Sequence, residues 1–335
     1  MKPTGKKTIH IGCGATVALA LTLCVFAFLY ISGKRAGQSR EAASPGEMID
    51  AGGMAFHAVR MGEGAPLVVL ESGLCASSLE WLPVQRDIAR FAPVMAYDRA
   101  GYGSSPEAEG PRTADVAAHG LRALLDAVGA KGPVVIVGHD AGALYALRFT
   151  TRHPSMVRGL VLVDPFPDDM PKYKSELEAA VYRNFIDRAW IYKTGRAVAN
   201  AGIVRALKIT PYLHAPAEIR PFMVDFFSDP ATYDTALAEY RALFASSAVS
   251  MPVVQPRMSV TLIRPSREKY LEHMLFFGVP VVEARKIEAL RDAQDRRLLA
   301  RSIAPLRVES NQATSNVHLE DPAVIVDTVR NMLGR

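Results

Sequence analysis

Hydrophobic residues recur along the chain in short blocks, with longer helix-like segments between them. The block Val134 to Val137 holds four consecutive β-branched residues, which predicts a strand buried on both faces of a sheet. Further strands are expected at Met54–Arg60, Pro66–Leu70, Val94–Tyr97, Leu160–Pro165, Ser259–Ile263 and Leu306–Glu309, with helices at Ala114–Val128 and Pro322–Leu333. Alternating strands and helices predict an α/β fold with a mostly parallel sheet covered on both faces.

The alternation stops between residues 166 and 250, where the chain is helix-like, aromatic-rich and interrupted by prolines. We therefore expect residues 47–165 and 251–335 to form one core and residues 166–250 to form an inserted helical lid. A lid at this place in the chain would cover the carboxyl ends of the strands, where ligands bind in open α/β sheets.

The first part of the chain has the composition of a membrane anchor. No Asp, Glu, Lys or Arg occurs from Thr8 to Ser32, which exceeds the roughly 20 residues that an α-helix needs to cross a bilayer. The end of this run, Phe28 to Ser32, fits signal-peptide cleavage poorly. The sequence predicts an uncleaved single-pass anchor over residues 1–33, with the transmembrane helix at about 9–32, and a linker over 34–46. Equal numbers of basic residues on both sides leave its orientation open.

Composition adds few constraints on partners. The 335 residues are 49% hydrophobic, and the net charge of +5 is concentrated near the first forty residues, so we expect no nucleic-acid partner. Of three cysteines, Cys13 and Cys24 lie in the apolar segment, and Cys75 is expected to be a buried, inert thiol. No Cys/His zinc spacing and no phosphate-binding glycine loop occur, so no metal or cofactor is expected.

The central strand runs into Gly138-His139-Asp140-Ala141-Gly142 and then into an apolar helix-forming segment. This is the G-x-Nuc-x-G arrangement, a sharp strand-to-helix turn that exposes its middle residue. Glycines are needed on both sides because a Cβ there would collide with the neighbouring strand or helix. The simpler alternative, a carboxylate stabilised at a helix N-terminus, explains neither glycine.

Three blocks together resemble the α/β-hydrolase superfamily over about residues 46 to 335. They are Glu71-Ser72-Gly73-Leu74, Asp98-Arg99-Ala100-Gly101-Tyr102-Gly103-Ser104, and the Asp140 turn combined with His318 ahead of Leu319-Glu320-Asp321-Pro322. The usual residue at the apex is serine, and the aspartate is similar to that of epoxide hydrolases and haloalkane dehalogenases. The resemblance implies an α/β-hydrolase fold, no cofactor and a small-molecule substrate.

An aspartate nucleophile suits attack on a saturated carbon. The reference pKa of an aspartate side chain is about 3.9, so it attacks without a base and forms an alkyl-enzyme ester. His318 would then activate water against the ester carbonyl. The family places the oxyanion donors at the backbone N–H groups of Leu74 and Ala141.

The sequence offers two candidates for the acid that orients His318. The commoner family position follows the strand Ser259–Ile263, where Glu268 is the nearest carboxylate. Asp164 ends the strand after the Asp140 turn, which is the alternative family position, and we place it ahead of Glu268. His139 is expected to point away from the site and to be structural.

Two features bear on the substrate. Haloalkane dehalogenases usually carry tryptophan after the nucleophile, where this chain has Ala141, so an epoxide is favoured over a halide. Epoxide hydrolases use lid tyrosines as acids, but their His-Gly-x-Pro block is absent. The lid tyrosines here, among which the sequence does not choose, are Tyr173, Tyr182, Tyr192, Tyr212, Tyr233 and Tyr240.

The sequence thus leads to one hypothesis with two rivals. The hypothesis is a membrane-anchored α/β-hydrolase that hydrolyses a small or medium apolar epoxide or alkyl halide through Asp140, His318 and Asp164. One rival is a carboxylester hydrolase of the same fold, because the flanking blocks resemble those of serine enzymes. The other is a non-catalytic binding or receptor module on a degenerate hydrolase scaffold.

Overall fold

The computed structural model describes residues 44–212, 216–245, 258–300 and 302–335. The predicted anchor over residues 1–33 and most of the predicted linker lie outside these residues. Among the helices that are described, none is long and apolar enough to cross a membrane. The structure therefore describes the globular part of the chain.

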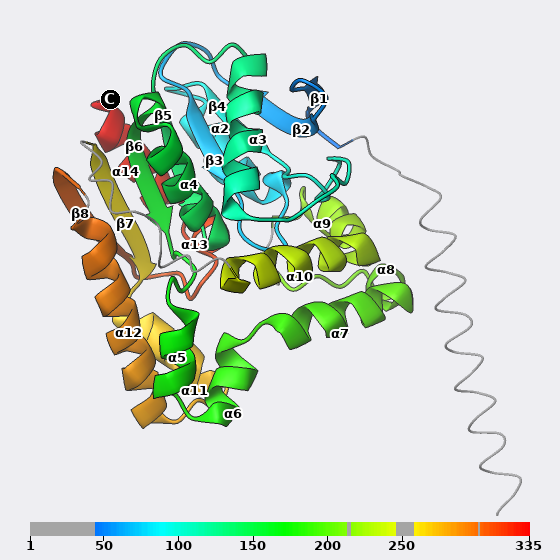
Figure 1. The fold of residues 1–335 in the computed structure, drawn as a ribbon, viewed down its shortest axis with the longest axis vertical. Coiled ribbons are helices and arrows are strands. Elements are labelled where there is room, and N and C mark those ends of the chain that lie inside the picture. The colour runs from blue at the N-terminus through cyan, green and yellow to red at the C-terminus, as the bar shows by residue number, and fades with distance from the viewer. Residues whose placement is uncertain (1–43, 213–215, 246–257, 301) are drawn as a thin grey trace, which may run out of the picture.

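In this part of the chain, eight strands form one sheet in the order β1-β2-β4-β3-β5-β6-β7-β8 (Figure 1). The strands are β1 (Glu47–Asp50), β2 (Ala55–Met61), β3 (Val68–Glu71), β4 (Val94–Tyr97), β5 (Val134–His139), β6 (Val157–Val163), β7 (Ser259–Pro265) and β8 (Ala304–Ser310). Only β1 with β2 and β2 with β4 pair antiparallel, and the other pairs are parallel, which confirms the predicted mostly parallel sheet. The sequence reading missed β1 because this strand is short, mostly exposed and acidic at both ends.

The central strands send alternate side chains to opposite faces of the sheet, as the pleat requires. Val68 and Leu70 pack into one apolar cluster with α2 (Leu82–Ile88) and α14 (Pro322–Leu333). Val69 packs into the other, with α3 (Ala114–Ala127) and α4 (Ala141–Arg152). Because both faces are covered, β3, β5 and β6 have almost no polar positions before their carboxyl ends.

The helices between β6 and β7 gather at the carboxyl end of the strands, below the sheet in Figure 1. Between β6 and β7 the chain forms α5 (Met170–Glu176), α6 (Ala179–Val181), the π-helix η3 (Tyr182–Ile186), α7 (Ala189–Asn200), α8 (Ile203–Leu207), α9 (Arg220–Ser228) and α10 (Pro230–Ala245). Elsewhere it forms η1 (Ser78–Trp81), η2 (Pro154–Met156), α11 (Arg267–Phe276), α12 (Val281–Leu299) and α13 (Val317–Glu320). We call the segment from α5 to α10 the lid.

A buried arginine connects the lid to the core. The Arg99 guanidinium donates to Glu71 Oε1 at 2.8 Å and to Glu239 Oε2 of α10 at 2.9 Å. It also donates to the backbone carbonyls of Ser72 and Gly73, at 2.6 and 2.8 Å. Both ion pairs are almost fully buried, and breaking such a pair by removing one partner is strongly destabilising. Arg99 therefore fixes both the loop after β3 and the position of α10.

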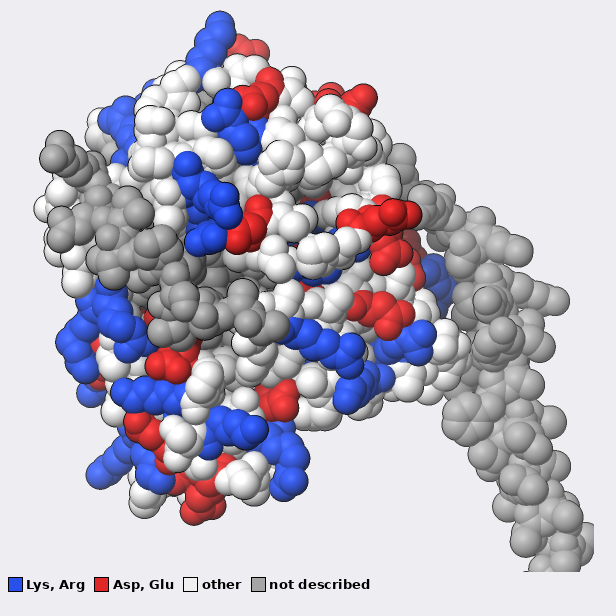
Figure 2. Space-filling model, viewed as in Figure 1, with Lys and Arg blue, Asp and Glu red and all other residues white. Residues whose placement is uncertain are grey.

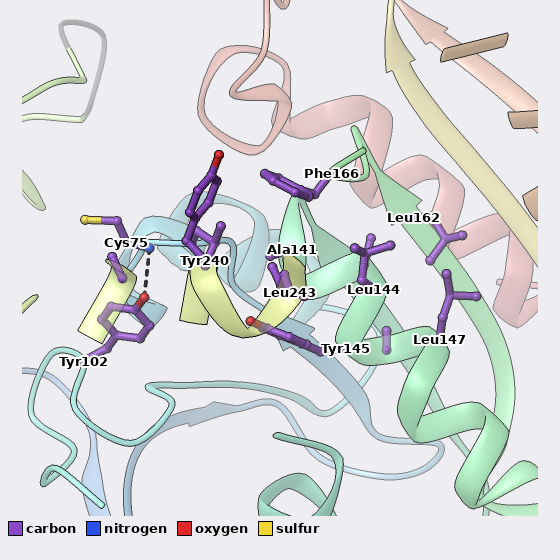
Figure 3. Close-up of a cluster of buried hydrophobic side chains, with 14 of the residues drawn as sticks. Cys75, Tyr102, Ala141, Leu144, Tyr145, Leu147, Leu162, Phe166, Tyr240 and Leu243 are labelled. Atoms are coloured by element: carbon purple, nitrogen blue, oxygen red, sulfur yellow. Dashed lines mark hydrogen bonds between the residues drawn. The ribbon is translucent and has the colours of Figure 1, made fainter. Parts of the chain in front are cut away.

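Apolar side chains add a second contact between lid and core. Figure 3 shows Tyr240 and Leu243 of α10 beside Phe166 and the first turn of α4, with the Phe166 and Tyr240 rings edge to face at 6.2 Å. Cys75 lies at the margin of this cluster and is buried, as expected from the sequence. Burial raises the pKa of its thiol, so the thiol stays protonated and unreactive.

Charges of both signs are interspersed over the face shown in Figure 2. Several of the exposed arginines are paired, among them Arg86 with Glu218 and Arg267 with Asp292. Exposed pairs of this kind contribute little to stability. This face therefore carries no continuous basic stripe.

Candidate active site

Asp140 stands at the apex of a strained turn between β5 and α4. Its backbone has φ 52° and ψ −120°, a conformation that residues with a side chain rarely adopt. Hydrogen bonds hold the peptide on both sides, from Asp140 N to the Val163 carbonyl and from Phe166 N to the Asp140 carbonyl, both at 3.0 Å. The turn thus projects the carboxylate from the carboxyl end of the sheet, as the G-x-Nuc-x-G spacing predicted.

The two glycines around Asp140 are required by close packing of the backbone. A Cβ on Gly138 would lie 2.6 Å from the Gly142 carbonyl oxygen. A Cβ on Gly142 would lie 2.5 Å from the Ser72 carbonyl oxygen and would also overlap the Glu71 carbonyl. The predicted collisions are therefore confirmed, and the neighbour at Gly142 is the loop that follows β3.

Gly142→Ala is expected to lower the free energy of unfolding by about 3 kcal/mol, the upper part of the range for overpacked sites. The cost is high because the atoms in the way are backbone carbonyls, which cannot rotate aside. Gly129→Ala is the control, since no atom lies within 4 Å of its added Cβ and only the cost of its positive φ remains, about 1 kcal/mol. Urea unfolding of both variants measures the difference, and equal losses would contradict this packing.

The loop after β3 supplies a backbone donor to Asp140. Leu74 N lies 3.2 Å from Asp140 Oδ2, and Gly73 allows this approach because a Cβ there would lie 3.0 Å from the Asp140 Cβ. Ala141, the second predicted donor, is fully buried and opens α4 directly after the carboxylate. The Leu74 N–H is therefore aimed at one carboxylate oxygen, which is the geometry of an oxyanion donor.

The other carboxylate oxygen contacts a lid arginine that the sequence reading did not single out. Arg188, directly before α7, donates from its guanidinium to Asp140 Oδ1 at 2.9 Å. The Arg188 side chain is 37% exposed, and its guanidinium lies 5.1 Å from the centre of the Phe166 ring. No motif marks this residue in the sequence, because its role depends on how the lid folds over the sheet.

His318 lies in the loop after β8, on α13, and its nearest carboxylate is Glu80. The two side chains are buried, and His318 Nε2 lies 3.2 Å from Glu80 Oε2. His318 Nδ1 has no hydrogen-bond partner among the described residues. Burial lowers the pKa of His318 to about 4 and raises the pKa of Glu80 to about 8. The pair is therefore neutral as a whole at pH 7 and holds a single exchangeable proton.

Neither predicted acid contacts His318. Asp164 accepts from Arg264 at 2.9 Å and from Arg291 at 2.7 Å. Burial alone would raise the pKa of Asp164, but the two arginines outweigh it and hold that pKa below its ordinary value. Glu268 is exposed on the first turn of α11. The structure therefore gives His318 a carboxylate neighbour, Glu80, that the sequence reading did not consider.

Glu80 could have been noticed from the sequence only as a helix cap. Ser77 and Glu80 form a capping box at the start of η1, with Ser77 N donating to Glu80 Oε1 at 3.2 Å. A capping glutamate normally lies at the surface, whereas this residue is 1% exposed and also hydrogen-bonds Tyr212 of the lid. The capping bond thus uses Oε1 of Glu80, and Oε2 is the oxygen that contacts His318.

The expectation that His139 points away from the site is wrong. Its ring lies beside that of His318, with the two imidazole centres 4.4 Å apart, and its centre is 6.5 Å from that of the Trp81 ring. His139 Nε2 donates to the Ser315 carbonyl at 3.4 Å, which leaves Nδ1 unprotonated. Burial, together with the neighbouring His318, lowers the pKa of His139 to about 4. Because the chain turns sharply at Asp140, the preceding residue, His139, stays close to the site.

Glu80→Gln is expected to flatten the pH dependence of stability between about pH 6.5 and 8. In this range the folded Glu80–His318 pair keeps one proton, whereas the unfolded chain has released it from both side chains. Because the folded state binds more protons, the free energy of unfolding falls as pH rises, by at most ~1.4 kcal/mol per pH unit. The glutamine variant lacks this titrating group.

Urea unfolding of both proteins at several pH values across this range measures the effect. All other titrating groups are common to the two proteins, so their contributions cancel in the comparison. Parallel curves would show that Glu80 is already ionised in the folded protein.

A cavity of about 340 Å³ opens beside Asp140, between the sheet and the lid. Its walls include the charged residues Asp140, Asp164, Arg188 and Arg291. The apolar and aromatic lining residues are Pro165, Phe166, Pro167, Tyr173, Phe185, Ile186, Trp190, Ile191, Tyr270 and Phe277. This volume lies in the range of small-molecule sites. The part of the chain that is described holds no cluster of His, Cys, Asp and Glu suited to a metal ion.

The six lid tyrosines differ in the hydrogen-bond partners and the exposure of their hydroxyl groups. Tyr173 lines the cavity, and its buried hydroxyl has no hydrogen-bond partner. Burial raises the pKa of Tyr173, so this phenol keeps its proton. The Tyr192 hydroxyl bonds with Arg188 and the Tyr212 hydroxyl with Glu80. The Tyr233 hydroxyl donates to the Phe227 carbonyl and the Tyr240 hydroxyl to Asp187. Tyr182 is partly exposed. Tyr173 is thus the tyrosine placed to meet a ligand.

A sequence profile of the alpha/beta hydrolase family matches residues 67–328. The chain belongs to this family. The match includes the Asp140 turn, the loop after β3, the lid and His318, so the family assignment from the three sequence blocks is confirmed.

Individual relatives cover smaller parts of the chain. The uncharacterized protein YqjL of Bacillus subtilis is 34% identical over 122 residues, which are 36% of this chain and 48% of that protein. A haloalkane dehalogenase of Agrobacterium fabrum is 31% identical over 117 residues, which are 35% of this chain and 38% of that protein. The chain thus spans less than half the length of these curated relatives.

Among solved structures, the epoxide hydrolase CorEH superimposes with a TM-score of 0.64. The match covers 86% of this chain and 98% of CorEH at 18% sequence identity. This similarity supports the α/β-hydrolase fold, including the lid, and says nothing by itself about the substrate.

Proposed function

We propose that this protein hydrolyses a small or medium substrate at a saturated carbon, with Asp140 as the covalent nucleophile. The observation that carries the proposal is the position of the Asp140 carboxylate. It stands at the apex of the turn and borders a cavity, and its Oδ2 lies 3.2 Å from the Leu74 N–H. Ala141 stands where haloalkane dehalogenases usually carry tryptophan, which favours an epoxide over a halide that is held by an indole N–H.

In the first step Asp140 Oδ1 attacks the carbon and the bond from that carbon to the leaving oxygen breaks. The products are an ester on Asp140 and an alkoxide. Attack on a carboxylic ester would instead give a reactive anhydride with little gain, so the saturated carbon suits this nucleophile better. Tyr173 is our candidate for the acid that gives its phenolic proton to the alkoxide, since the residue borders the cavity and its buried hydroxyl has no hydrogen-bond partner among the described residues.

In the second step water adds to the ester carbonyl while His318 takes a proton from it. The negative charge then develops on the Asp140 oxygen that faces Leu74 N–H, where a preorganised donor stabilises it. Collapse of this intermediate releases the diol and restores the Asp140 carboxylate. The proton on His318 returns through solvent to the Tyr173 phenolate. The sum is epoxide plus water giving diol.

His318 can act as this base in one protonation state of the Glu80–His318 pair. When Glu80 is ionised and accepts from His318 Nε2–H, the unpartnered Nδ1 carries the lone pair. Because burial raises the pKa of Glu80 to about 8, this state becomes dominant only near and above that pH. Glu80 takes the orienting role that the sequence reading assigned to Asp164 or Glu268.

A non-catalytic binding module is the second candidate, and two contacts favour it. Arg188 occupies Asp140 Oδ1, and His318 Nε2 is turned to Glu80 rather than to Asp140. A degenerate scaffold that only binds ligands would tolerate both contacts. We also propose, from the uncharged run Thr8–Ser32 alone, that the domain is tethered to a membrane.

Isotope labelling over two turnovers tests the proposed function. One equivalent of a styrene-type epoxide, or of an alkyl bromide, reacts first in oxygen-18 water and a second equivalent then reacts in ordinary water. If the ester forms on Asp140, the first product is unlabelled, the Asp140 peptide gains label, and the second product contains it. Label in the first product would indicate direct attack by water. Absence of turnover on epoxides, halides and esters, with ligand still bound, would favour the binding module.

A further inference from the structure

Arg188 is the one lid cation that touches the proposed nucleophile among the described residues. Its guanidinium donates to Asp140 Oδ1 at 2.9 Å and lies over the Phe166 ring, and it forms part of the cavity wall. The remaining cavity cation, Arg291, is bound to Asp164 at 2.7 Å. Asp140, the partner of Arg188, therefore loses its charge when the ester forms, whereas Asp164, the partner of Arg291, keeps its charge.

The lid holds Arg188 in place from two directions. Its backbone N–H donates to the Tyr240 hydroxyl at 3.1 Å, and that hydroxyl donates to Asp187 Oδ1 at 2.7 Å. The Tyr192 hydroxyl forms a hydrogen bond with the Arg188 side chain. A guanidinium anchored in this way presents its remaining N–H groups to the cavity without reorganisation when a ligand enters.

The two Asp140 oxygens differ in their partners, and this identifies the attacking atom. Oδ2 faces the Leu74 N–H, the place where the oxyanion develops in ester hydrolysis. Oδ1 faces Arg188 and the cavity, so the carbon that Asp140 attacks must approach on the Arg188 side. Once Oδ1 is esterified it carries no charge, and Arg188 loses its counter-ion in a partly buried place.

We propose that Arg188 is a catalytic residue that binds the leaving atom as an anion. This inference rests on the proposed function. With an alkyl bromide, the Asp140 Oδ1–carbon bond forms as the carbon–bromine bond breaks, and the bonding pair departs with bromide. The negative charge thus moves from Oδ1 to bromide while Arg188 stays adjacent to both. With an epoxide, Arg188 stabilises the cleaved oxygen until it is protonated. The substrate is therefore one whose leaving atom becomes an anion when its bond to the attacked carbon breaks and then stays bound to Arg188.

This assignment accounts for Ala141. A haloalkane dehalogenase usually holds the halide with an indole N–H next to its nucleophile, and Ala141 offers no such donor. Arg188 supplies charged donors from the lid instead, and charge-assisted hydrogen bonds are roughly twice as strong as neutral ones. The guanidinium can therefore replace the missing tryptophan from a different element.

Bromide binding tests the inference without turnover. Asp140→Asn removes the carboxylate charge and so mimics the ester, which frees Arg188 for an anion. Titration of the full-length protein with sodium bromide, followed by calorimetry and by quenching of Trp190 in the cavity wall, is expected to show saturable binding. The double variant Asp140→Asn/Arg188→Gln is expected to bind about tenfold more weakly or worse.

The matched control is Asp140→Asn/Arg196→Gln. Arg196 lies on α7, the helix that directly follows Arg188, but it pairs with Asp234 outside the cavity, so this variant should bind bromide like Asp140→Asn alone. Equal bromide affinity with and without Arg188, or no binding by Asp140→Asn while it remains folded, would overturn the inference. Because no chemistry is required, these outcomes do not depend on whether Asp140 forms an ester.

A kinetic readout separates binding of the leaving atom from a structural role. The burst of ester formation is compared for alkyl iodide, bromide and chloride of the same chain. Arg188→Gln is expected to slow the burst by ~10²-fold with iodide and more with chloride, which concentrates its charge most. An equal slowing for all three halides would indicate that Arg188 only positions the lid. A wild-type enzyme without any burst would instead contradict the proposed function.

Discussion

Asp140→Asn is expected to lower turnover of epoxides and alkyl halides by about 10⁴-fold or more. The amide has the shape of the carboxylate but no negative charge, so it cannot attack a saturated carbon at a useful rate. Leu74 N–H can still donate to the amide oxygen, so the turn and the cavity should keep their structure. Single-turnover kinetics with the most reactive epoxide of the substrate panel measures the loss.

Two controls make this result specific. Asp126→Asn changes an exposed aspartate of α3 that pairs only with Arg122 and should leave turnover unchanged. Thermal unfolding of Asp140→Asn should remain cooperative, with a small change in stability, because the Arg188 partner is partly solvated. Retention of more than about a tenth of the activity would exclude Asp140 as the nucleophile and point to direct activation of water.

His318→Gln is expected to stop the reaction at the ester. Alkylation of Asp140 does not need a base, whereas attack of water on the ester does, and loss of a general base typically costs about 10²–10⁴-fold. The variant should release less than one equivalent of diol, and mass spectrometry should find the substrate's mass on the peptide that contains Asp140. The wild-type protein should carry this adduct only while substrate remains and should lose it afterwards, whereas the variant should retain it.

His139→Gln distinguishes the two imidazoles, whose ring centres are only 4.4 Å apart. His139 Nε2 is engaged by the Ser315 carbonyl, so this variant should turn over repeatedly and should not retain ester once substrate is consumed. If His139→Gln accumulates the ester and His318→Gln does not, the base is His139. If both turn over normally, neither imidazole activates the water.

The pH dependence of ester hydrolysis should follow the Glu80–His318 pair. The rate is expected to rise with pH, with its midpoint near pH 8 and a plateau above it, because the pair must lose its proton before Nδ1 can accept one. In Glu80→Gln the plateau should begin at lower pH, since the raised carboxyl pKa is gone. This shift in the profile would distinguish an orienting role of Glu80 from a purely structural one.

Several features could be predicted from the sequence because they depend on neighbours along the chain. Strand and helix positions followed from the spacing of apolar residues, and the Asp140 turn followed from Gly138 and Gly142. The glycines were informative because a backbone collision forbids any larger residue at either position. Asp140 and His318 were selected by the family pattern, and the structure places both at the carboxyl end of the sheet.

The partners of these two residues could not be predicted in the same way. Glu80 and His318 are 238 residues apart, and Glu80 reads locally as an ordinary helix cap. Asp164 was chosen because it ends the right strand, yet Arg264 and Arg291 reach it first from β7 and α12. The end of a strand determines where the backbone of an acidic residue lies, while the neighbouring elements determine which cation its carboxylate contacts.

By itself, the sequence determined the α/β-hydrolase scaffold and the carboxylate at its turn, because both depend on local spacing and on steric limits of the backbone. Only the tertiary structure decided that Arg188 faces Asp140, that Glu80 faces His318, and that Tyr173 is the lid tyrosine free in the cavity. These contacts join side chains from separate elements. Their geometry depends on how the lid and loops pack, which no short stretch of residues encodes.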